Sequence, residues 1–364
     1  MTSQVGILAW DIGGANIKVA FAQADSGVVT KLNTTSKYLP LWRVGKEAIQ
    51  PVLTELREKA CELEPVDFVA ATMTAELSDV YASKKEGVNH ILRCVEETHV
   101  GLPILVLCSD GSLQPISDAR LRPMDVAAAN WFATGWLASR FLKTCVAIDV
   151  GSTTTSIIPV VSGRVANRGK TDLEKLSNGE LVYTGALRTN VAAILKRASL
   201  QGREFRVSSE LFALSADVHL LLGNISEQDY TTETADGRSR SVRDACARLA
   251  RVVCADDEML TREEIYELAR QTYDAQLQDI CCGLEQVISD GGLSKETTPV
   301  VATGLGRTFL AERAAHLSGF KTILDLGGVT GLGSSAKFAP AVGLSLMALT
   351  HTSGRELKWT QLSK

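Results

Sequence analysis

This sequence of 364 residues lacks the features that mark membrane, secreted and nucleic-acid-binding proteins. No apolar run approaches the roughly 18–20 residues of a membrane span, and the N-terminus has neither the basic start nor the long apolar segment of a signal peptide. The net charge is -4, and no basic stripe is present. We therefore expect a cytoplasmic protein that binds neither nucleic acid nor membranes.

Patterns for zinc binding and for a disulfide framework are missing as well. The eight cysteines are scattered along the chain without a Cys-x-x-Cys pair, and the five histidines are scattered too. Structural zinc sites use closely spaced cysteine and histidine ligands. We expect free thiols in a reducing compartment and predict no zinc site.

What the sequence does contain is an alternation of strand-like and helix-like segments, which is typical of α/β proteins. With 364 residues the chain is too long for one ordinary core, so two domains are expected. Strands are predicted at residues 5–10, 17–23, 66–72, 103–107, 298–303 and 322–326. Helices are predicted at 41–63, 86–97, 124–142, 187–198, 208–222, 240–254, 261–289, 309–317 and 336–349.

One short pattern occurs twice. AWDIGGANIKVAFA, at residues 9–22, returns as VAIDVGSTTTSIIPV at residues 146–160. Both copies predict a strand, an Asp-x-Gly turn and a second strand, with Asp149 in the place of Asp11. The repeat indicates a duplicated domain with a boundary near residue 143.

The two turns have the composition of phosphate-binding loops. Glycine allows backbone N–H groups to approach anionic oxygens, hydroxyl and amide side chains add hydrogen bonds, and a carboxylate at the strand end can hold Mg²⁺. We predict that Asp11 and Asp149 are metal ligands with a catalytic role. The alternative is a pair of ordinary type I′ hairpins. The predicted diphosphate-binding residues are Gly13, Gly14, Asn16, Lys18, Gly151, Ser152, Thr153 and Thr154, together with Gly304 and Gly306 of a third motif.

That third motif is PVVATGLGR at residues 299–307, a buried strand that runs into Gly-x-Gly and a helix. Such a turn can place a helix N-terminus at a phosphate or a nucleoside. The similar LDLGG at 324–328 has no following strand and is interpreted as a strand end.

Four polar stretches lie between these motifs and supply the candidates for substrate chemistry. They are TMTAELSDVYASKKEGV (72–88), ELVYTGALRT (180–189), SSELFALSADVHLLLG (208–223) and TADGR (234–238). Glu210 and Asp217 are seven residues apart, which predicts one face of a single helix. Structural roles are the alternative for each stretch. Glu76 and Asp217 are the catalytic candidates, and the substrate-binding candidates are Lys84, Arg188, Glu210, Asp236 and Arg238.

The twin turns and the Gly-x-Gly motif resemble the two phosphate loops and the adenosine motif of the actin-like ATPase superfamily, which includes sugar kinases, acetate kinase and Hsp70. The resemblance covers nearly the whole chain. It implies an α/β fold of two duplicated domains around a ligand cleft. The first domain would comprise residues 1–142 with the C-terminal helix 336–364, and the second residues 143–335.

Within that superfamily, the segments TMTAELSD, KKEGV, AAANW, VYTGALRT and TADGR look like one narrower family. This is the hydantoinase/oxoprolinase-related family linked to tetrahydromethanopterin-dependent C1 transfer, one branch of which acts in methanofuran biosynthesis. The resemblance implies a transferase that condenses 5-(aminomethyl)furan-3-ylmethyl diphosphate with γ-glutamyltyramine or a related phenol. Pyrophosphate would be released, and Mg²⁺ would be the cofactor.

Two other functions would use the same loops. An ATP-dependent small-molecule kinase would bind the diphosphate of a nucleotide there, and a non-catalytic ATP-binding sensor would use the fold without chemistry. The narrower motif set favours the transferase, whose partners would be the small-molecule diphosphate and the phenolic acceptor. The sequence leaves the oligomeric state open, including a homo-oligomer.

Overall fold

The computed structural model describes residues 4–62, 64–256 and 258–359. Its internal contacts divide the chain into two compact units. Unit 1 comprises Met1–Ala147, Ile158–Ser177 and Leu324–Lys364, and unit 2 comprises Ile148–Ile157 and Asn178–Ile323. The domain boundaries expected from the sequence stay a prediction.

Unit 1 is built on a sheet of six strands. They are β1 Gln4–Ile12, β2 Asn16–Asp25, β3 Val28–Tyr38, β4 Phe68–Met73, β5 Ile104–Leu107 and β6 Leu113–Pro115. The strand order is β3-β2-β1-β4-β5-β6. The central β1 pairs antiparallel with β2 and parallel with β4, and its last seven residues are all buried. Its continuous apolar run is therefore explained by cover on both faces.

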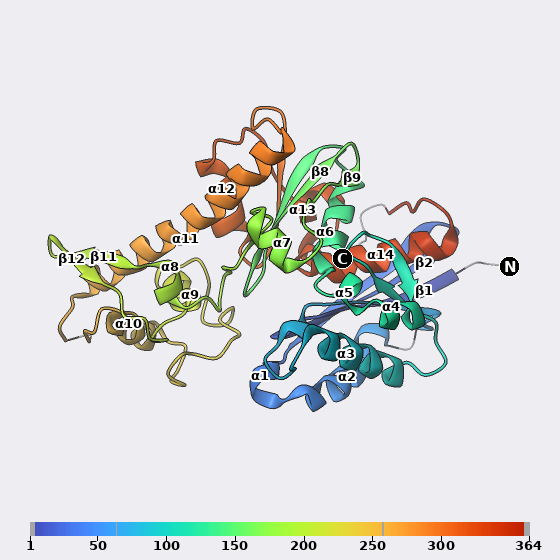
Figure 1. Cartoon of the computed structure of the whole chain (residues 1–364), viewed down its shortest axis with the longest axis horizontal. Helices are drawn as coiled ribbons and strands as arrows, with labels where there is room; N and C mark the ends of the chain where they lie inside the picture. Colours follow the sequence, from blue (N-terminus) through green and yellow to red (C-terminus); the bar gives the residue numbers. More distant parts are fainter. Residues whose placement is uncertain (1–3, 63, 257, 360–364) are drawn as a thin grey trace. The chain divides into compact units, whose positions relative to one another are not determined.

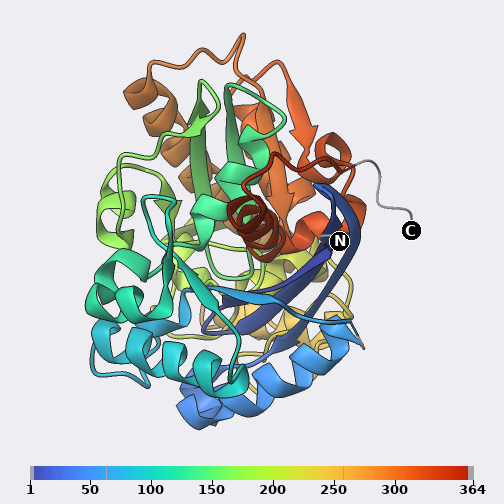
Figure 2. The ribbon, with the colours of Figure 1, turned by 90° about the vertical axis from the view of Figure 1, so that its right-hand side faces the viewer.

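Helices supply that cover. Those of unit 1 are α1 Leu41–Val44, α2 Ile49–Cys61, α3 Lys84–Thr98, α4 Ile116–Leu121, α5 Pro123–Val126, α6 Asn130–Ser139, α7 Asp172–Ser177, α13 Leu326–Thr330 and α14 Ala339–Ser353, with 3-10 turns η1 Lys46–Ala48, η2 Ala75–Leu77 and η4 Gly333–Phe338. α2 packs against β2, β3 and α3, whereas α14 packs against β1, β2, β4 and α6. Figures 1 and 2 show these two helix layers on opposite faces of the sheet. α14 is buried all round from Ala339 to Leu349, as its apolar sequence requires.

A second sheet carries the repeated motif. Its strands are β7 Cys145–Val150, β8 Thr155–Val161, β9 Arg164–Val165, β10 Leu181–Val182, β13 Val300–Gly304 and β14 Ile323–Asp325. The order is β10-β8-β7-β13-β14, with β9 paired to β8. The border between the two units passes through β7 and β8.

Unit 2 is organised around one long helix. Its remaining elements are α8 Val191–Ile194, β11 Arg197–Leu200, β12 Arg203–Arg206, α9 Ser215–Leu221, α10 Val242–Arg251, α11 Arg262–Gly291, the π-helical turn η3 Arg307–Ala311 and α12 Glu312–Leu317. α11 begins at a capping box formed by Thr261 and Glu264 and ends at Gly292 in the left-handed conformation. α9, α10, α12 and the β11–β12 hairpin all contact it (Figure 1).

The structure confirms the predicted strands apart from their end residues, but four expected helices are wrong. The helix predicted at 187–198 is reduced to the single turn α8, and residues 197–198 belong to β11. The helix predicted at 124–142 is interrupted between α5 and α6, where Ala128 has a positive φ, and the one predicted at 41–63 is divided at Gly45.

Residues 208–222 do not form a single helix, because α9 begins only at Ser215. The Asp217 carboxylate accepts a hydrogen bond from the Leu214 amide at 3.0 Å, which caps the helix start. Glu210 lies in the preceding segment, so it does not share a helix face with Asp217.

None of the helices in the described ranges is both long and apolar enough to span a lipid bilayer.

Candidate functional site

The two Asp-x-Gly turns have the same backbone hydrogen bond. In unit 1 the turn joins β1 to β2, and the Gly13 amide donates to the Asn16 carbonyl over 3.0 Å. In unit 2 the turn joins β7 to β8, and the Gly151 amide donates to the Thr154 carbonyl over 2.9 Å. The repeat in the sequence is therefore also a structural repeat.

The glycines of these turns are not demanded by backbone conformation. A type I′ hairpin needs positive φ at both central residues, and Gly14, Ala15, Ser152 and Thr153 all lack it. The alternative of ordinary type I′ hairpins is therefore wrong. A Cβ atom added to Gly14 would lie 3.9 Å from its nearest neighbour, and one added to Gly151 would lie 3.5 Å away. The fold has room for a side chain at both positions, whereas a Cβ atom at Gly13 would lie 2.7 Å from the Asn16 carbonyl oxygen. At Gly14 and Gly151, glycine leaves the backbone open to an anion.

Asp11 lies at the end of β1 and is almost fully buried. The Asn130 side-chain amide, at the start of α6, donates to Asp11 Oδ1 over 3.2 Å, and Lys18 Nζ lies 3.8 Å from Oδ2. Burial raises the pKa of Asp11, and the positive charge of Lys18 opposes that effect. A buried carboxylate that is only partly compensated is a favourable place for a further cation.

Mg²⁺ fits this type of site. It prefers hard oxygen ligands and is usually held by one or two carboxylates together with substrate phosphates. Among residues 4–62, 64–256 and 258–359, no three His, Cys, Asp or Glu side chains gather into a metal centre made by protein alone. Asp11 of unit 1 and the half-buried Asp149 of unit 2 each suit the carboxylate-plus-phosphate type.

The turn of unit 2 is enclosed by residues 184–188. The Ala186 amide donates to the Gly151 carbonyl, and the next two amides donate to the Ser152 carbonyl, each over 3.0 Å. This close approach depends on Gly185, because a Cβ atom there would lie 2.6 Å from the Thr153 backbone.

Arg188 is carried to the turn by this segment. Its Nη1 donates to Thr153 Oγ1 over 3.0 Å. A guanidinium held beside a glycine turn with several hydroxyl groups favours an anionic ligand. This position favours a phosphate as the ligand of Arg188.

The Gly-x-Gly motif packs against β7 just before the same turn. Gly304 has a φ of 86°, and an added Cβ atom would lie 2.4 Å from the Val150 carbonyl oxygen and 2.5 Å from Asp149 Oδ1. The Gly306 amide donates to the Val150 carbonyl over 3.0 Å. Packing thus accounts for both glycines, and their role in diphosphate binding stays a prediction.

A buried polar network supports the enclosing segment. Gln276 of α11 donates through Nε2 to Thr184 Oγ1 at 2.8 Å and to the Gly185 carbonyl at 2.9 Å. The Gly185 carbonyl can only accept a hydrogen bond, so the Gln276 amide nitrogen faces it and Gln276 Oε1 faces His219. His219 Nε2, 3.0 Å from Gln276 Oε1, therefore carries the proton and donates the hydrogen bond. His219 Nδ1 then accepts from the Asn224 amide at 3.1 Å. Burial lowers the pKa of His219 to about 3, so the ring is neutral.

In unit 1, four charged residues form what we call the acid–base cluster: Glu76, Lys84, Asp172 and Lys175. Lys84 Nζ lies 3.6 Å from Glu76 Oε1 and 3.1 Å from Asp172 Oδ2, and Lys175 Nζ lies 3.6 Å from Asp172 Oδ1. Glu76 is 1% exposed, and neither of its carboxylate oxygens has a hydrogen-bond partner in the described part of the chain. α3 approaches it closely through Gly87, where a Cβ atom would lie 2.6 Å from Glu76 Cα.

Burial raises the pKa of Glu76 to about 7 from 4.5, against the lowering effect of the Lys84 charge. Between these two pH values the folded protein binds more protons than the unfolded chain, so stability falls as the pH rises through that range. Glu76→Gln removes the titrating group. We expect wild type to lose about 3 kcal/mol relative to this variant between about pH 4.5 and about pH 8, as measured by urea unfolding. Glu97→Gln, an exposed change on α3, should follow wild type, and a pH-independent difference for Glu76→Gln would contradict the prediction.

Asp217 and Asp236 belong to one ion-pair network, with Asp217 buried in the core and Asp236 at the exposed end. Arg248 donates to Asp217 Oδ1 through Nε at 2.9 Å and Nη2 at 2.7 Å, and to Asp236 Oδ1 through Nη1 at 3.1 Å. The Tyr230 hydroxyl also donates to Asp217 Oδ1, at 3.1 Å. The network ties the TADGR loop to α9 and α10, which favours a structural role for both aspartates.

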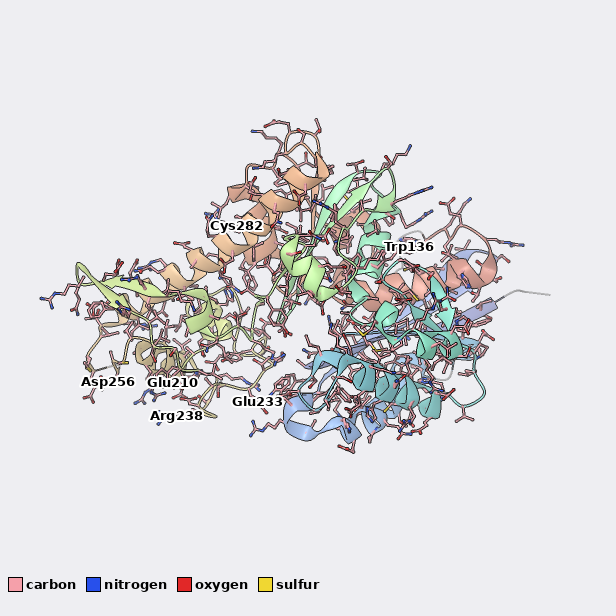
Figure 3. All side chains as sticks on the ribbon, viewed as in Figure 1. Trp136, Glu210, Glu233, Arg238, Asp256 and Cys282 are labelled. Carbon is pink, nitrogen blue, oxygen red and sulfur yellow. The ribbon has the colours of Figure 1, made fainter. Side chains whose placement is uncertain are left out.

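Two further candidates lie on the surface of unit 2. Glu210 and Arg238 are exposed (Figure 3), the latter with 61% of its side chain accessible. Arg238 Nε lies 3.9 Å from Asp236 Oδ2. Their substrate-binding roles stay predictions, as do those of the other site candidates.

The structure also adds residues that the sequence did not single out. Asn130 contacts Asp11 across 119 positions, and Gln276 contacts Thr184 across 92. Asn130 lies within the AAANW segment that was noted only as part of the family pattern. Nothing local distinguishes Asp172, Lys175 or Gln276 from ordinary helix residues.

Comparison with known proteins shows the family to which this chain belongs. The model of the hydantoinase/oxoprolinase family matches residues 67–341, which is most of the chain. The chain belongs to the hydantoinase/oxoprolinase family.

Among curated proteins, this hydantoinase/oxoprolinase family member is similar to the (4-{4-[2-(gamma-L-glutamylamino)ethyl]phenoxymethyl}furan-2-yl)methanamine synthase of Methanocaldococcus jannaschii. The two are 36% identical over 310 residues, which cover 85% of this chain and 88% of the relative. A synthase of the same name from Methanococcus vannielii is 36% identical over 176 residues, covering 48% of this chain and 77% of that protein.

Among solved structures, nucleotide-free acetone carboxylase shares the fold of this hydantoinase/oxoprolinase family member. The TM-score is 0.58 at 8% sequence identity, with 95% of this chain and 70% of the other chain covered. The expected actin-like α/β fold is thereby confirmed.

Proposed function

We propose that the protein is a transferase of methanofuran biosynthesis that forms an aryl ether by displacing diphosphate. The observation that carries this proposal is the 36% identity, over 85% of the chain, to the Methanocaldococcus jannaschii synthase. The name of that synthase describes a product in which a phenoxymethyl group joins a phenyl ring to an aminomethyl-substituted furan. The proposed substrates are 5-(aminomethyl)furan-3-ylmethyl diphosphate and γ-glutamyltyramine or a related phenol.

The reaction sets two chemical tasks. The phenol oxygen forms a bond to the furan CH₂ group, and the bond from that carbon to the diphosphate oxygen breaks with its electron pair on the oxygen. The phenol proton passes to a base. The protein must therefore stabilise the negative charge that develops on the diphosphate and must accept a proton.

We assign the first task to the turn of unit 2. The backbone of Gly151, the hydroxyl groups of residues 152–154 and the Arg188 guanidinium are the groups proposed to bind the diphosphate. Support comes from the contact of Arg188 with Thr153 and from the glycine at position 151, where the fold has room for a side chain. In unit 1, Gly13, Gly14, Asn16 and Lys18 are proposed to bind diphosphate oxygens in the same way.

Mg²⁺ is proposed as the cofactor, with Asp11 and Asp149 as the residues that would hold it. When bound, Mg²⁺ supplies positive charge that favours departure of the diphosphate. Lys18, 3.8 Å from Asp11 Oδ2, adds charge of the same sign.

The test is an assay that follows both products. Purified protein with Mg²⁺, the furan-methyl diphosphate and a tyramine derivative should release pyrophosphate and form the ether, detected by mass spectrometry. Each product should require both substrates, and chelation of Mg²⁺ should stop the reaction. Parallel reactions with ATP serve as the control, because acceptor-dependent release of ADP without ether formation would replace the transferase by a kinase.

A further inference from the structure

The second task is acceptance of the phenol proton. Glu76 and Asp217, the two catalytic candidates from the sequence, differ in whether they are available for it. Asp217 accepts four hydrogen bonds, three at Oδ1 from Arg248 and Tyr230 and one at Oδ2 from Leu214. Glu76 accepts none from the described residues at either oxygen. A ligand hydroxyl can therefore donate to Glu76 without breaking an existing hydrogen bond, whereas at Asp217 it would compete with a guanidinium.

Glu76 also lies beside the first glycine turn. A Cβ atom added to Gly14 would lie 3.9 Å from Cα of Ala75, the residue before Glu76, and the Thr74 amide donates to the Ile12 carbonyl over 2.9 Å. The β4–η2 segment that carries Glu76 is thus fixed to the end of β1.

Lys84 is the partly exposed neighbour of this buried carboxylate. Its side chain is 22% exposed, and its Nζ bridges Glu76 and Asp172. The lysine ammonium sits on a flexible stem, so it can keep the shorter contact with Asp172 while a ligand O–H group takes its place beside Glu76 Oε1.

We propose that Glu76 accepts the phenol proton during ether formation, an assignment that rests on the proposed function. As the phenol oxygen bonds to the furan CH₂ group and the diphosphate leaves with its electron pair, the proton moves from that oxygen to Glu76 Oε1. The carboxylate becomes a neutral carboxyl group, the form that its buried surroundings favour. The proton leaves to water before the next turnover.

Two charged neighbours of Glu76 allow a test in which the pH dependence of activity is expected to shift in opposite directions. The charged and titratable groups around it are Lys84 on α3, Asp172 on α7 with Lys175 beyond it, and Tyr81 in the η2–α3 loop. Burial has the largest effect and raises the pKa of Glu76. The positive charge of Lys84 lowers this pKa, and the negative charge of Asp172 raises it. The acidic limb of the kcat/KM profile should move to higher pH in Lys84→Met and to lower pH in Asp172→Asn.

The main experiment compares phenolic acceptors. Glu76→Gln should reduce kcat with tyramine by roughly 10²–10⁴-fold, the range for loss of a general base, while the KM for the diphosphate stays near wild type. Ring-fluorinated and nitrated tyramines ionise at lower pH and need less help from a base, so the loss should shrink along that series. Glu97→Gln on the same helix as Lys84 is the matched control and should behave as wild type.

The outcomes separate the two proposals. If wild type forms no ether, the proposed function is wrong. If wild type forms ether but Glu76→Gln loses the same factor with every acceptor, Glu76 is not the base. If Glu76→Gln does not fold, Lys84→Met and Asp172→Asn provide the test. Opposite shifts of the acidic limb of the kcat/KM profile support the assignment. An unchanged acidic limb in both variants overturns it.

Discussion

Replacing Arg248 by leucine should lower the free energy of unfolding by about 3–5 kcal/mol. Arg248 is 0% exposed, and it donates hydrogen bonds to Asp217, Asp236 and the Ser239 carbonyl. Leucine leaves the Asp217 carboxylate buried with its charge uncompensated. One unpaired buried charge destabilises the folded state more than the absence of both charges does. Chemical unfolding monitored by circular dichroism at neutral pH measures the change.

The matched control is the double variant Arg248→Leu with Asp217→Asn. It removes both charges, so part of the lost stability should return. A single variant that loses less than about 1 kcal/mol would place Asp217 in contact with solvent or another cation, and would restore it as a candidate for chemistry. With the expected result, Asp217 is a structural residue that fixes the TADGR loop.

Changing Asp11 or Asp149 to asparagine should reduce kcat by about a hundredfold or more. This is the effect of removing one electrostatic contact to charge that develops in a transition state. The expectation rests on the matched positions of the two carboxylates before turns with the same hydrogen bond. Asparagine has nearly the same size as aspartate, so the unfolding midpoint of Asp149→Asn should stay close to that of wild type. In Asp11→Asn, the Oδ1 atom of the new asparagine can still accept the hydrogen bond from Asn130.

Two measurements test this prediction. Steady-state pyrophosphate release gives kcat, and thermal stabilisation by pyrophosphate with Mg²⁺ gives binding, which should weaken in both variants. Asp118→Asn in unit 1 and Asp274→Asn in unit 2, both exposed, are the controls. Wild-type turnover in both Asp11→Asn and Asp149→Asn would remove the two turns from the catalytic site.

The parts of this protein that the sequence by itself determined are those encoded by neighbouring residues. Each Asp-x-Gly turn joins two strands that follow each other in the chain, and its defining hydrogen bond spans only three residues. Apolar runs that fit strands and helices depend on local periodicity in the same way. The strands around both turns, the repeat of the turn and the family therefore follow from short stretches of the amino-acid sequence alone.

Only the tertiary structure decided which polar side chains meet. Lys84 and Asp172 are 88 positions apart, and Gln276 and Thr184 are 92 apart, so no local pattern links them. The same holds for the contrast between Glu76 and Asp217, which the sequence presents as equivalent acids. One is buried without hydrogen-bond partners in the described chain, and the other is saturated by Arg248 and Tyr230. Burial and pairing set the protonation of a carboxylate, and both arise from the packing of elements that are distant in the chain.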